Sequence, residues 1–427
     1  MLLKSSKRIS VIALGISLFS MSALGMGPGK ASKVDSLLQA VRENSGKLFF
    51  ATGVATAAFL GYKYWSPLKR SLSACVNAFF RPHSYTLSSS EVVFVVGSST
   101  IINGSVADLQ HTQEQEHQIS LEFHNKITVD NINGNIEIES HDLPYVKAKI
   151  IKKAATQQDL NNIHVTLSQD QSTIKFKTWH NHAMRALVHY KLQVPKNHQY
   201  FLNQDLKTKN GKISSQNTRD SVNAETNNGE IMLRRIGGAA TAKSLNGSVT
   251  LENIGGDATA HSSNGAIQVK NVRGANTVCN TNNGAITVEN VVDLHAKTNS
   301  GAIDVKQVRN AELKAGGTIT AKDIFATDYF NAQTTNGTIE IKNQIFHFPC
   351  TLATTNGCLS IAAQSLDVMA RIKTTNGRVK SDFTLSNVVG HRSNQRNDFT
   401  ATIGNDDSPF SLDLSATNGS ITLKRLN

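Results

Sequence analysis

Outside its N-terminal region, the chain lacks the excess of basic residues that is typical of nucleic-acid-binding proteins. The 427 residues carry a net charge of +12, but residues 1–85 contribute 11 basic residues against only Asp35 and Glu43. The remaining residues hold 33 basic and 30 acidic side chains, a net charge of +3. A nucleic-acid site needs clustered cations that follow a phosphate backbone. The sequence therefore predicts no nucleic-acid partner, and the excess of basic over acidic residues belongs mainly to an N-terminal targeting and membrane-proximal region.

The sequence also lacks local catalytic motifs. It contains no Ser-His-Asp arrangement, phosphate-binding loop or dinucleotide fingerprint. These absences favour a protein that is not an enzyme and has no cofactor. Catalytic groups can also converge from distant parts of a chain, so the motif search leaves an enzyme open as an alternative.

A repeated segment dominates the second half of the sequence. Asn-Gly or a variant of it recurs at steps of 16 to 20 residues, ending at Gly211, Gly229, Gly247, Gly265, Gly284, Gly301, Gly317, Gly337, Gly357 and Gly377. A fixed period of this length is typical of stacked coils.

Alignment of the repeats on the Asn of Asn-Gly indicates which positions face inward. Apolar residues stand three and five positions after it, as in Val249 and Leu251, and alternate with polar ones as in a strand with one buried face. A small apolar residue, such as Ala242, stands four positions before it, and a third apolar column follows about eight positions after it. Three inward-facing segments per turn predict an all-β fold, a right-handed parallel β-helix (solenoid) of about ten coils of 16–20 residues.

The Asn-Gly pairs are predicted to form one stacked corner of this helix. Gly would supply positive φ, and Asn would form hydrogen bonds along an amide ladder. Antiparallel hairpins are the rival interpretation of each pair, but hairpins require neither a constant period nor a column of small Ala residues. The predicted structural turn ladder consists of Asn228, Gly229, Asn246, Gly247, Asn264, Gly265, Asn283, Gly284, Asn336, Gly337, Asn356, Gly357, Asn376 and Gly377.

The N-terminal region resembles export and membrane segments. Basic residues precede an apolar run from Ile9 to Phe19, which predicts a signal peptide over residues 1–25, with an uncleaved anchor as the alternative. We expect a short amphipathic helix over 26–47 and a membrane helix over 48–65 that ends in the aromatic residues Tyr62, Tyr64 and Trp65. A linker over 66–89, an irregular β region over 90–205 and the β-helix repeat domain over 206–427 follow.

These segments predict a cell-envelope protein, anchored in the membrane through its N-terminal segment. We expect its repeats to face the periplasm or the exterior. If the signal peptide were cleaved and the second helix spanned the membrane, the repeats would face the cytoplasm instead.

The repeat resembles the bacterial putative-adhesin family, a domain of unknown function made of β-strand repeats and similar to toastrack domains. The resemblance rests on the NGxIxV cores that begin at seven of the Asn residues above and on the strand from His189 to Pro195, and it covers about residues 90–427. It implies an architecture of β-strand repeats but carries no catalytic signature. Two departures stand out: Gly316-Gly317 replaces Asn-Gly, and 42 residues separate Gly377 from Gly419, which predicts a missing coil or a loop.

The positions of the cysteines and histidines in the repeat do not favour a disulfide bridge or a metal site. Cys279 and Cys350 fall on inward positions and Cys358 on an outward corner, so we expect buried free thiols, with a bridge between Cys350 and Cys358 as the alternative. His180 and His182 share one face of a strand and could begin a metal site. No third ligand stands nearby, so we expect solvated or aromatic-packed histidines and no metal.

The function that follows is a non-catalytic, adhesin-like β-helix of the cell envelope, which acts as a binding or scaffolding surface for a glycan or a protein. A carbohydrate-active β-helix enzyme is the first alternative, and it requires two or three carboxylates within about 5–10 Å in one groove. The second is a structural envelope protein that associates end to end, since the segment from Ser420 to Leu426 has no evident polar cap.

Overall fold

The structure is a computed structural model that describes residues 109–121, 125–170, 172–180, 185–196, 202–326, 328–346, 348–404 and 407–426. The predicted signal peptide (1–25), amphipathic helix (26–47), membrane helix (48–65) and linker (66–89) lie outside these residues. Within the described ranges, no helix is both long and apolar enough to cross a membrane.

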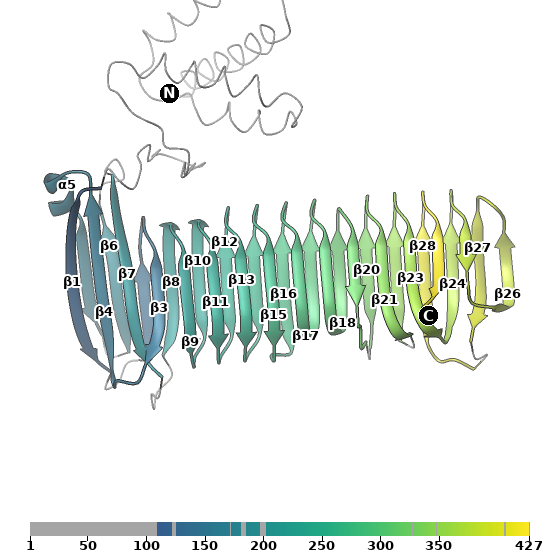
Figure 1. Cartoon of the computed structure of the whole chain (residues 1–427), viewed down its shortest axis with the longest axis horizontal. Coiled ribbons are helices and arrows are strands. Elements are labelled where there is room, and N and C mark those ends of the chain that lie inside the picture. Colours follow the sequence, from purple (N-terminus) through teal and green to yellow (C-terminus); the bar gives the residue numbers. More distant parts are fainter. Residues whose placement is uncertain are drawn as a thin grey trace, which may run out of the picture. The chain divides into compact units, whose positions relative to one another are not determined.

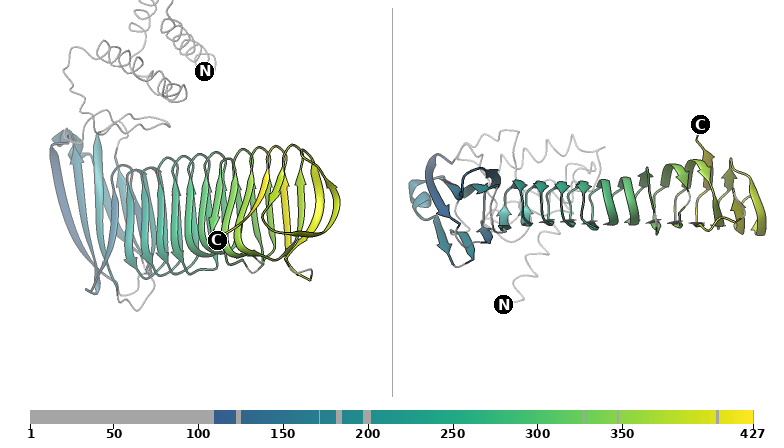
Figure 2. Two further views of the ribbon diagram at one scale, coloured as in Figure 1. Left: turned by 45° about the vertical axis from the view of Figure 1, so that its right-hand side comes forward. Right: turned by 90° about the horizontal axis from the view of Figure 1, so that it is seen from below.

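The repeats form a flat solenoid of two facing β layers, which confirms the all-β prediction. Strands lie side by side along the long axis of the stack (Figure 1), which is a thin band when seen from below (Figure 2). We call the layer that contains the strands before each Asn-Gly corner layer A. In spatial order it consists of β5 (His164–Gln169), β6 (Thr173–Trp179), β2 (Lys126–Asp130), β8 (Asn203–Asn210), β10 (Val222–Asn228), β12 (Ala240–Ser244), β14 (Ala258–Ser262), β16 (Asn276–Thr281), the second halves of β17 (Ile286–Thr298) and β18 (Ile303–Ala315), β20 (Phe330–Thr334), β22 (Cys350–Thr354), β28 (Ser411–Ala416), β24 (Val368–Thr374), β27 (Asn397–Ile403) and β26 (Leu385–Arg392).

Layer B contains the strands that follow each corner. In spatial order it consists of β1 (His111–Ser120), β4 (Tyr145–Ala154), β7 (Ala186–Pro195), β3 (Ile136–His141), β9 (Ile213–Thr218), β11 (Ile231–Ile236), β13 (Val249–Ile254), β15 (Ile267–Val272), the first halves of β17 and β18, β19 (Ile319–Lys322), β21 (Ile339–Phe346), β23 (Leu359–Leu366), β29 (Ile421–Arg425) and β25 (Val379–Ser381).

Consecutive coils pair in parallel and in register, with each repeat position beside its equivalent. Ile231 pairs with Val249 and Val249 with Ile267 in layer B, while Ala242 pairs with Ala260 in layer A. The side chains of these residues are buried in one continuous apolar core. The Asn-Gly pairs are therefore corners between stacked coils and not hairpin turns. In such a stack the short Ala side chains hold the layers close together, so the interior is filled.

Each regular coil contains two strands, where the sequence predicted three segments. The third apolar column, which includes Ile254 and Val272, lies at the end of the layer B strand and not on a strand of its own. The residue immediately before it has positive φ, as in Asn253 (57°) and Asn271 (56°). A residue in the left-handed conformation bends the chain there and turns the next side chain inward. In the sequence, this extra inward-facing apolar residue resembles a third strand.

The reason for glycine at the Asn-Gly corner also differs from the prediction. Gly247 does not have positive φ; its Cα faces the coil below, and a Cβ built on it would lie 1.7 Å from the carbonyl oxygen of Gly229. Glycine is required because backbones of successive coils come too close for any side chain.

The N-terminal end of the stack departs from the repeat. β1 and β4, and β4 and β7, pair antiparallel within layer B, and β5 and β6 do so within layer A. The short helix α5 (Gln157–Asn161) joins β4 to β5, with the Thr156 hydroxyl accepting a hydrogen bond from the backbone N–H of Asp159 at 3.0 Å. These inserted strands explain why the 90–205 region alternates like strands but is not periodic.

The C-terminal strands do not lie at the end of the stack. β28 pairs with β22 on one side and β24 on the other, and β29 likewise lies between β23 and β25. The chain thus leaves a gap one coil wide after Leu366, continues through β24 and β25, makes the antiparallel pair β26 and β27, and returns to fill the gap. The 42-residue step from Gly377 to Gly419 reflects neither a missing coil nor a loop, and the premise that the last residues form an open terminal rung was wrong.

The thiols lie where the repeat columns place them. Cys279 and Cys350 are buried, Cys358 is exposed, and none of the three forms a disulfide. Burial raises the pKa of Cys279 to about 12 and that of Cys350 well above its usual range. The prediction of buried free thiols is confirmed, and the bridge between Cys350 and Cys358 is absent.

In a Cys75→Ser background, we expect a thiol reagent at pH 8 to modify Cys358 in the native protein, whereas Cys279 and Cys350 should react only after unfolding in urea. Because the pKa of Cys279 is raised, the unfolded chain loses this proton first. The contribution of Cys279 to the free energy of unfolding is therefore complete below about pH 9. It falls between pH 9 and 12, with a limiting slope of about 1.4 kcal/mol per pH unit. Fast native labelling of Cys279, mapped by mass spectrometry, would contradict this assignment.

Candidate functional site

The predicted turn-ladder residues line one edge of the stack. Asn246 Nδ2 donates to Asn228 Oδ1 at 2.6 Å, Asn264 to Asn246 at 2.7 Å and Asn283 to Asn264 at 2.7 Å. A second run joins Asn356 to Asn336, Asn418 to Asn356 and Asn376 to Asn418, at 2.8–3.0 Å. Because the C-terminal coil is inserted, Asn418 lies between Asn356 and Asn376.

The ladder extends beyond the predicted residues and is interrupted once. Asn210 donates to Asn133 and Asn228 donates to Asn210, both at 2.7 Å, so the ladder reaches the N-terminal coils. Ser300 and Gly316 occupy the Asn position in the two coils between the runs. The paired amides satisfy each other along the stack, which is a structural role.

Sequence analysis missed a hydroxyl column beneath these corners. Two positions before the Asn stands a buried Ser or Thr that bonds to two coils. Ser262 Oγ donates to the carbonyl of Gly247 at 3.0 Å and accepts from the backbone N–H of Gly265 at 2.9 Å. Thr298 bonds to Gly284 and Gly301 in the same way. The signal was visible in the sequence, because a hydroxyl residue recurs at a position that would otherwise face the apolar core.

A second amide ladder runs along the opposite edge of layer B, through the residues with positive φ. Asn271 donates to Asn253 at 2.9 Å, and Asn290 donates to Asn271 at the same distance. Asn adopts left-handed geometry more readily than most residues, which explains its recurrence here.

A row of basic and acidic side chains on the outer face of layer B forms alternating ion pairs. Arg234 lies 3.1 Å from Glu252, and Glu289 lies 2.9 Å from Lys270 and 4.0 Å from Lys306. The Lys270 ammonium lowers the pKa of the Glu289 carboxyl, first through their hydrogen bond. Exposed pairs of this kind contribute about 0–1 kcal/mol each to the stability of the fold. The main effect of the row is therefore to neutralise the charge of this surface.

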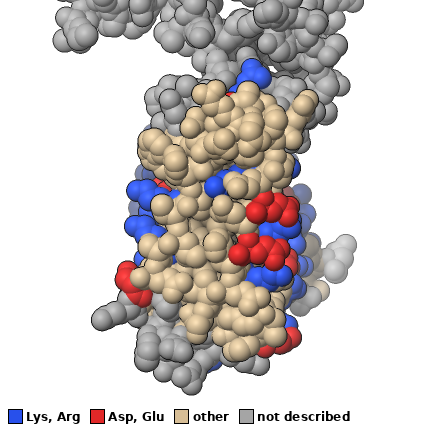
Figure 3. Space-filling model, turned by 90° about the vertical axis from the view of Figure 1, so that its left-hand side faces the viewer, with Lys and Arg blue, Asp and Glu red and all other residues tan. Residues whose placement is uncertain are grey.

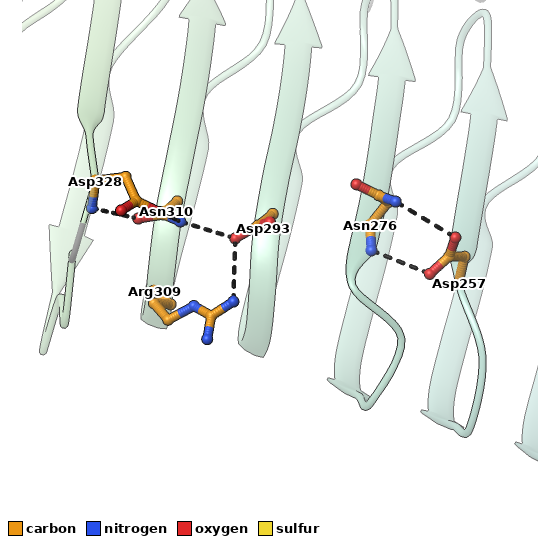
Figure 4. Close-up of polar contacts among 6 residues, drawn as sticks. All are labelled: Asp257, Asn276, Asp293, Arg309, Asn310 and Asp328. Atoms are coloured by element: carbon orange, nitrogen blue, oxygen red, sulfur yellow. Dashed lines mark hydrogen bonds and ion pairs between the residues drawn. The ribbon is translucent and has the colours of Figure 1, made fainter.

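A row of acidic and amide side chains at the start of the layer A strands is the clearest polar cluster that sequence analysis missed (Figure 4). Asp257 Oδ1 accepts a hydrogen bond from the backbone N–H of Asn276 at 3.1 Å. Farther along, Asn310 Nδ2 donates to Asp293 at 3.0 Å and to Asp328 at 3.1 Å. The row was hidden because Asp and Asn alternate there, and because Asp328 is offset by one residue from its column.

The Asp293–Asn310–Asp328 group brings two carboxylates close together, as the enzyme alternative requires. Since both carboxylates contact Asn310 Nδ2, they lie within about 6 Å of each other, inside the range for paired glycosidase carboxylates. The buried amide of Asn310 occupies the space between them, however, and Arg309 lies 3.9 Å from Asp293. The Asn310 amide thus takes the hydrogen bonds that a water or a glycosidic oxygen would need, and this arrangement suits a structural bridge between coils.

Metal and ligand sites are not prominent. No group of three or more His, Cys, Asp or Glu residues in the described ranges could hold a metal ion. The prediction for His180 was a solvated or an aromatic-packed side chain, and the solvated alternative is wrong because His180 is buried. His182 lies outside the described residues. Two open hollows have volumes of about 220 Å³, beside Lys126 and Asp205, and about 360 Å³, beside Arg378 and Arg392.

Comparison with known proteins identifies the family. No curated protein sequence matches the chain. Among solved structures, a putative cell adhesion protein from Clostridium sporogenes aligns at 8% identity and a TM-score of 0.18, covering 74% of this chain and 100% of that one. A putative adhesin from Bacteroides fragilis aligns at 11% identity and a TM-score of 0.24, covering 74% of this chain and 97% of that one. The sequence profile of the Toastrack DUF4097 family matches residues 124–424, and the chain belongs to this family.

Proposed function

We propose that the protein is a non-catalytic, adhesin-like scaffold of the cell envelope that binds a glycan or another protein on the outer face of layer B. The observation that carries this proposal is a flat stripe of small and neutral polar side chains. One of its columns contains Ser248, Ala266 and Ala285, and the column beside it contains Thr250, Gln268 and Thr287, after which Asp304 ends the neutral stripe. The stripe is bordered by the Asn-Gly corner on one side and the charge row on the other.

The geometry of this stripe suits recognition of an extended ligand. Equivalent side chains repeat about every 4.8 Å along the stack, on a backbone fixed by parallel pairing. Gln268 and Thr287 are exposed and occupy equivalent positions on successive coils, so they offer amide and hydroxyl groups in a regular row. Since the stripe is already ordered, a ligand would lose little affinity to ordering of the protein.

Two features favour binding over catalysis. The one close pair of carboxylates in the row of Figure 4 is bridged by Asn310, and the interior of the solenoid is filled with apolar side chains. A deep pocket that could exclude water from a reacting bond would need space that this core does not leave. The enzyme alternative would regain support if the purified full-length chain degraded polysaccharides.

The test is a binding screen of the full-length chain on arrays of glycans and envelope proteins, followed by a substitution within the stripe. We expect Gln268→Lys to weaken binding of a captured ligand by roughly tenfold, because it removes a hydrogen-bonding amide and introduces a charge. The stability of an exposed position like this should change by less than about 0.5 kcal/mol.

Gln333→Lys is the matched control, since the same change is made at an exposed outward position of layer A. Equal weakening by both substitutions would point to a general charge effect, and no effect of Gln268→Lys would exclude the stripe as the contact surface.

Three finer expectations stay predictions. These are the right-handed sense of the coil, the membrane anchor with outward-facing repeats, and end-to-end association. For end-to-end association, the expected contact surface is no longer the C-terminal segment. It is the edge strand β26, whose Val388 and Val389 are exposed. The bulge beside Asn387 and the terminal Arg392 oppose such pairing, as charges and bulges do on other edge strands.

A further inference from the structure

The end of the stack that carries β26 contains a hollow lined by cations. It has a volume of about 360 Å³, and its lining includes Arg378, Lys380 and Arg392 together with Ser393 and Asn394. The two sides come from different layers, because Lys380 lies on the last strand of layer B and Arg392 ends the last strand of layer A.

The cations of this hollow are not dictated by the repeat. Arg378 and Lys380 stand two and four positions after Asn376, in columns that are neutral in the adjacent coil. There the backbone N–H of Arg378 meets the hydroxyl of Ser420, and Lys380 pairs with Thr422. The basic character therefore appears where the stack ends and not as part of a ladder.

The turn that forms the second side is held rigidly on the last corner. Ser393 Oγ accepts from the backbone N–H of Arg396 at 2.9 Å, and the backbone N–H of Gly377 donates to the carbonyl of Gln395 at 2.9 Å. Buried Asn397 donates to the carbonyl of Gly377 at 3.2 Å. The position of the hollow is thus set before any ligand arrives.

Neighbouring acids do not neutralise these cations. Asp398 lies 3.7 Å from Lys373, and Asp382 accepts a hydrogen bond from the backbone N–H of Arg425 at 3.2 Å. The Arg392 guanidinium lies 5.7 Å from the centroid of the Phe399 ring, which orients it. Within the described ranges no carboxylate forms an ion pair with Arg378, Lys380 or Arg392.

The opposite end of the stack provides the contrast. There, on the end that carries β1, cationic and anionic side chains are interspersed (Figure 3). Lys149 lies 2.7 Å from Glu114, and Lys147 lies 3.8 Å from Glu116. Mixed charge at one end and unpaired cations at the other imply that an anion would prefer the β26 end.

We propose that this hollow binds the carboxylate of an acidic polysaccharide, such as a uronate unit. Guanidinium groups match carboxylates through paired N–H donors, and the hydroxyl of Ser393 and amide of Asn394 can bond to the neighbouring sugar hydroxyls. This proposal names a class of ligand for one end of the stack, and it rests on the proposed function as a binding scaffold.

The experiment measures binding of polygalacturonate to the full-length chain by calorimetry. Heparin serves as a sulfated polymer, dextran as a neutral one and inorganic phosphate as a competitor. We expect polygalacturonate to bind, dextran not to bind, and Arg378→Gln and Arg392→Gln each to weaken binding about tenfold through loss of a charge-assisted contact. Unchanged thermal unfolding of both variants would show that the fold is intact.

Lys306→Gln is the matched control, because it removes one exposed positive charge from layer B. Equal weakening by Lys306→Gln would overturn the site in favour of a general charge effect. Stronger binding of heparin, or full competition by phosphate alone, would replace the carboxylate with a sulfate or phosphate group and overturn the assignment. Binding of neutral glycans or proteins without polygalacturonate would refute this site alone, whereas no ligand in any arm would refute the proposed function as well.

Discussion

Gly247→Ala is expected to destabilise the solenoid by about 3 kcal/mol or more, although it adds a single methyl group. The new Cβ would lie 1.7 Å from the carbonyl oxygen of Gly229, 2.3 Å from its carbonyl carbon and 3.0 Å from the backbone nitrogen of Glu230. All three atoms belong to the backbone of the adjacent coil, which cannot move without breaking the corner. Insertion into a well-packed region costs about 1–3 kcal/mol where side chains can yield, and here none can. Urea unfolding followed by circular dichroism measures the effect.

Ser248→Ala is the control for this substitution, since it changes the next residue, whose side chain points outward. We expect it to alter stability by less than about 0.5 kcal/mol. A Gly247→Ala variant as stable as the original chain would mean that successive coils are farther apart at this corner than the structure indicates.

Removal of residues 407–427 should unfold residues 368–404 while leaving the preceding coils folded. The deleted strands fill the gap between β22 and β24 and between β23 and β25, and they bury Leu412, Leu414, Ile421 and Leu423. Each such side chain contributes about 1.5–3 kcal/mol, so the loss is roughly 6 kcal/mol or more. Limited proteolysis with mass spectrometry should reveal new cleavage sites after Leu366 and none within the earlier coils.

A single substitution tests the same threading without truncation. Leu414→Asp places a charge in the core and should expose residues 368–404 to protease, whereas Ser415→Asp, on the outward neighbour, should not. If residues 368–404 stayed protected after truncation, β24 would have moved one strand spacing to pair with β22, and the inserted coil would not be needed to hold the end.

The sequence was informative wherever one coil repeats the next. Columns such as Ala242 and Ala260, or Val249 and Ile267, predicted which side chains are buried and that coils pair in parallel, because a stacked coil must bury equivalent positions. The inward positions of Cys279 and Cys350 followed from the same columns.

It was less informative about backbone conformation. Glycine at a corner is compatible with positive φ and with close backbone approach, and the letters do not distinguish them. Here the close approach applies at Gly247, while the left-handed positions belong to residues such as Asn253. The hydroxyl column that contains Ser262 recurs in the sequence, but its role does not follow from the sequence, because one of its two partners lies on the adjacent coil.

By itself, then, the sequence determined the period, the inward columns, the all-β class and the family resemblance, because these depend on local alternation and on repetition. Only the tertiary structure decided that the last coil is inserted between earlier ones, that Asn310 fills the space between two carboxylates, and that Arg378 and Arg392 share one hollow. The inserted coil joins strands that are far apart in the chain, whereas the other two features depend on individual side chains that break the repeat. Periodicity carries no information about them, because it describes only what successive coils share.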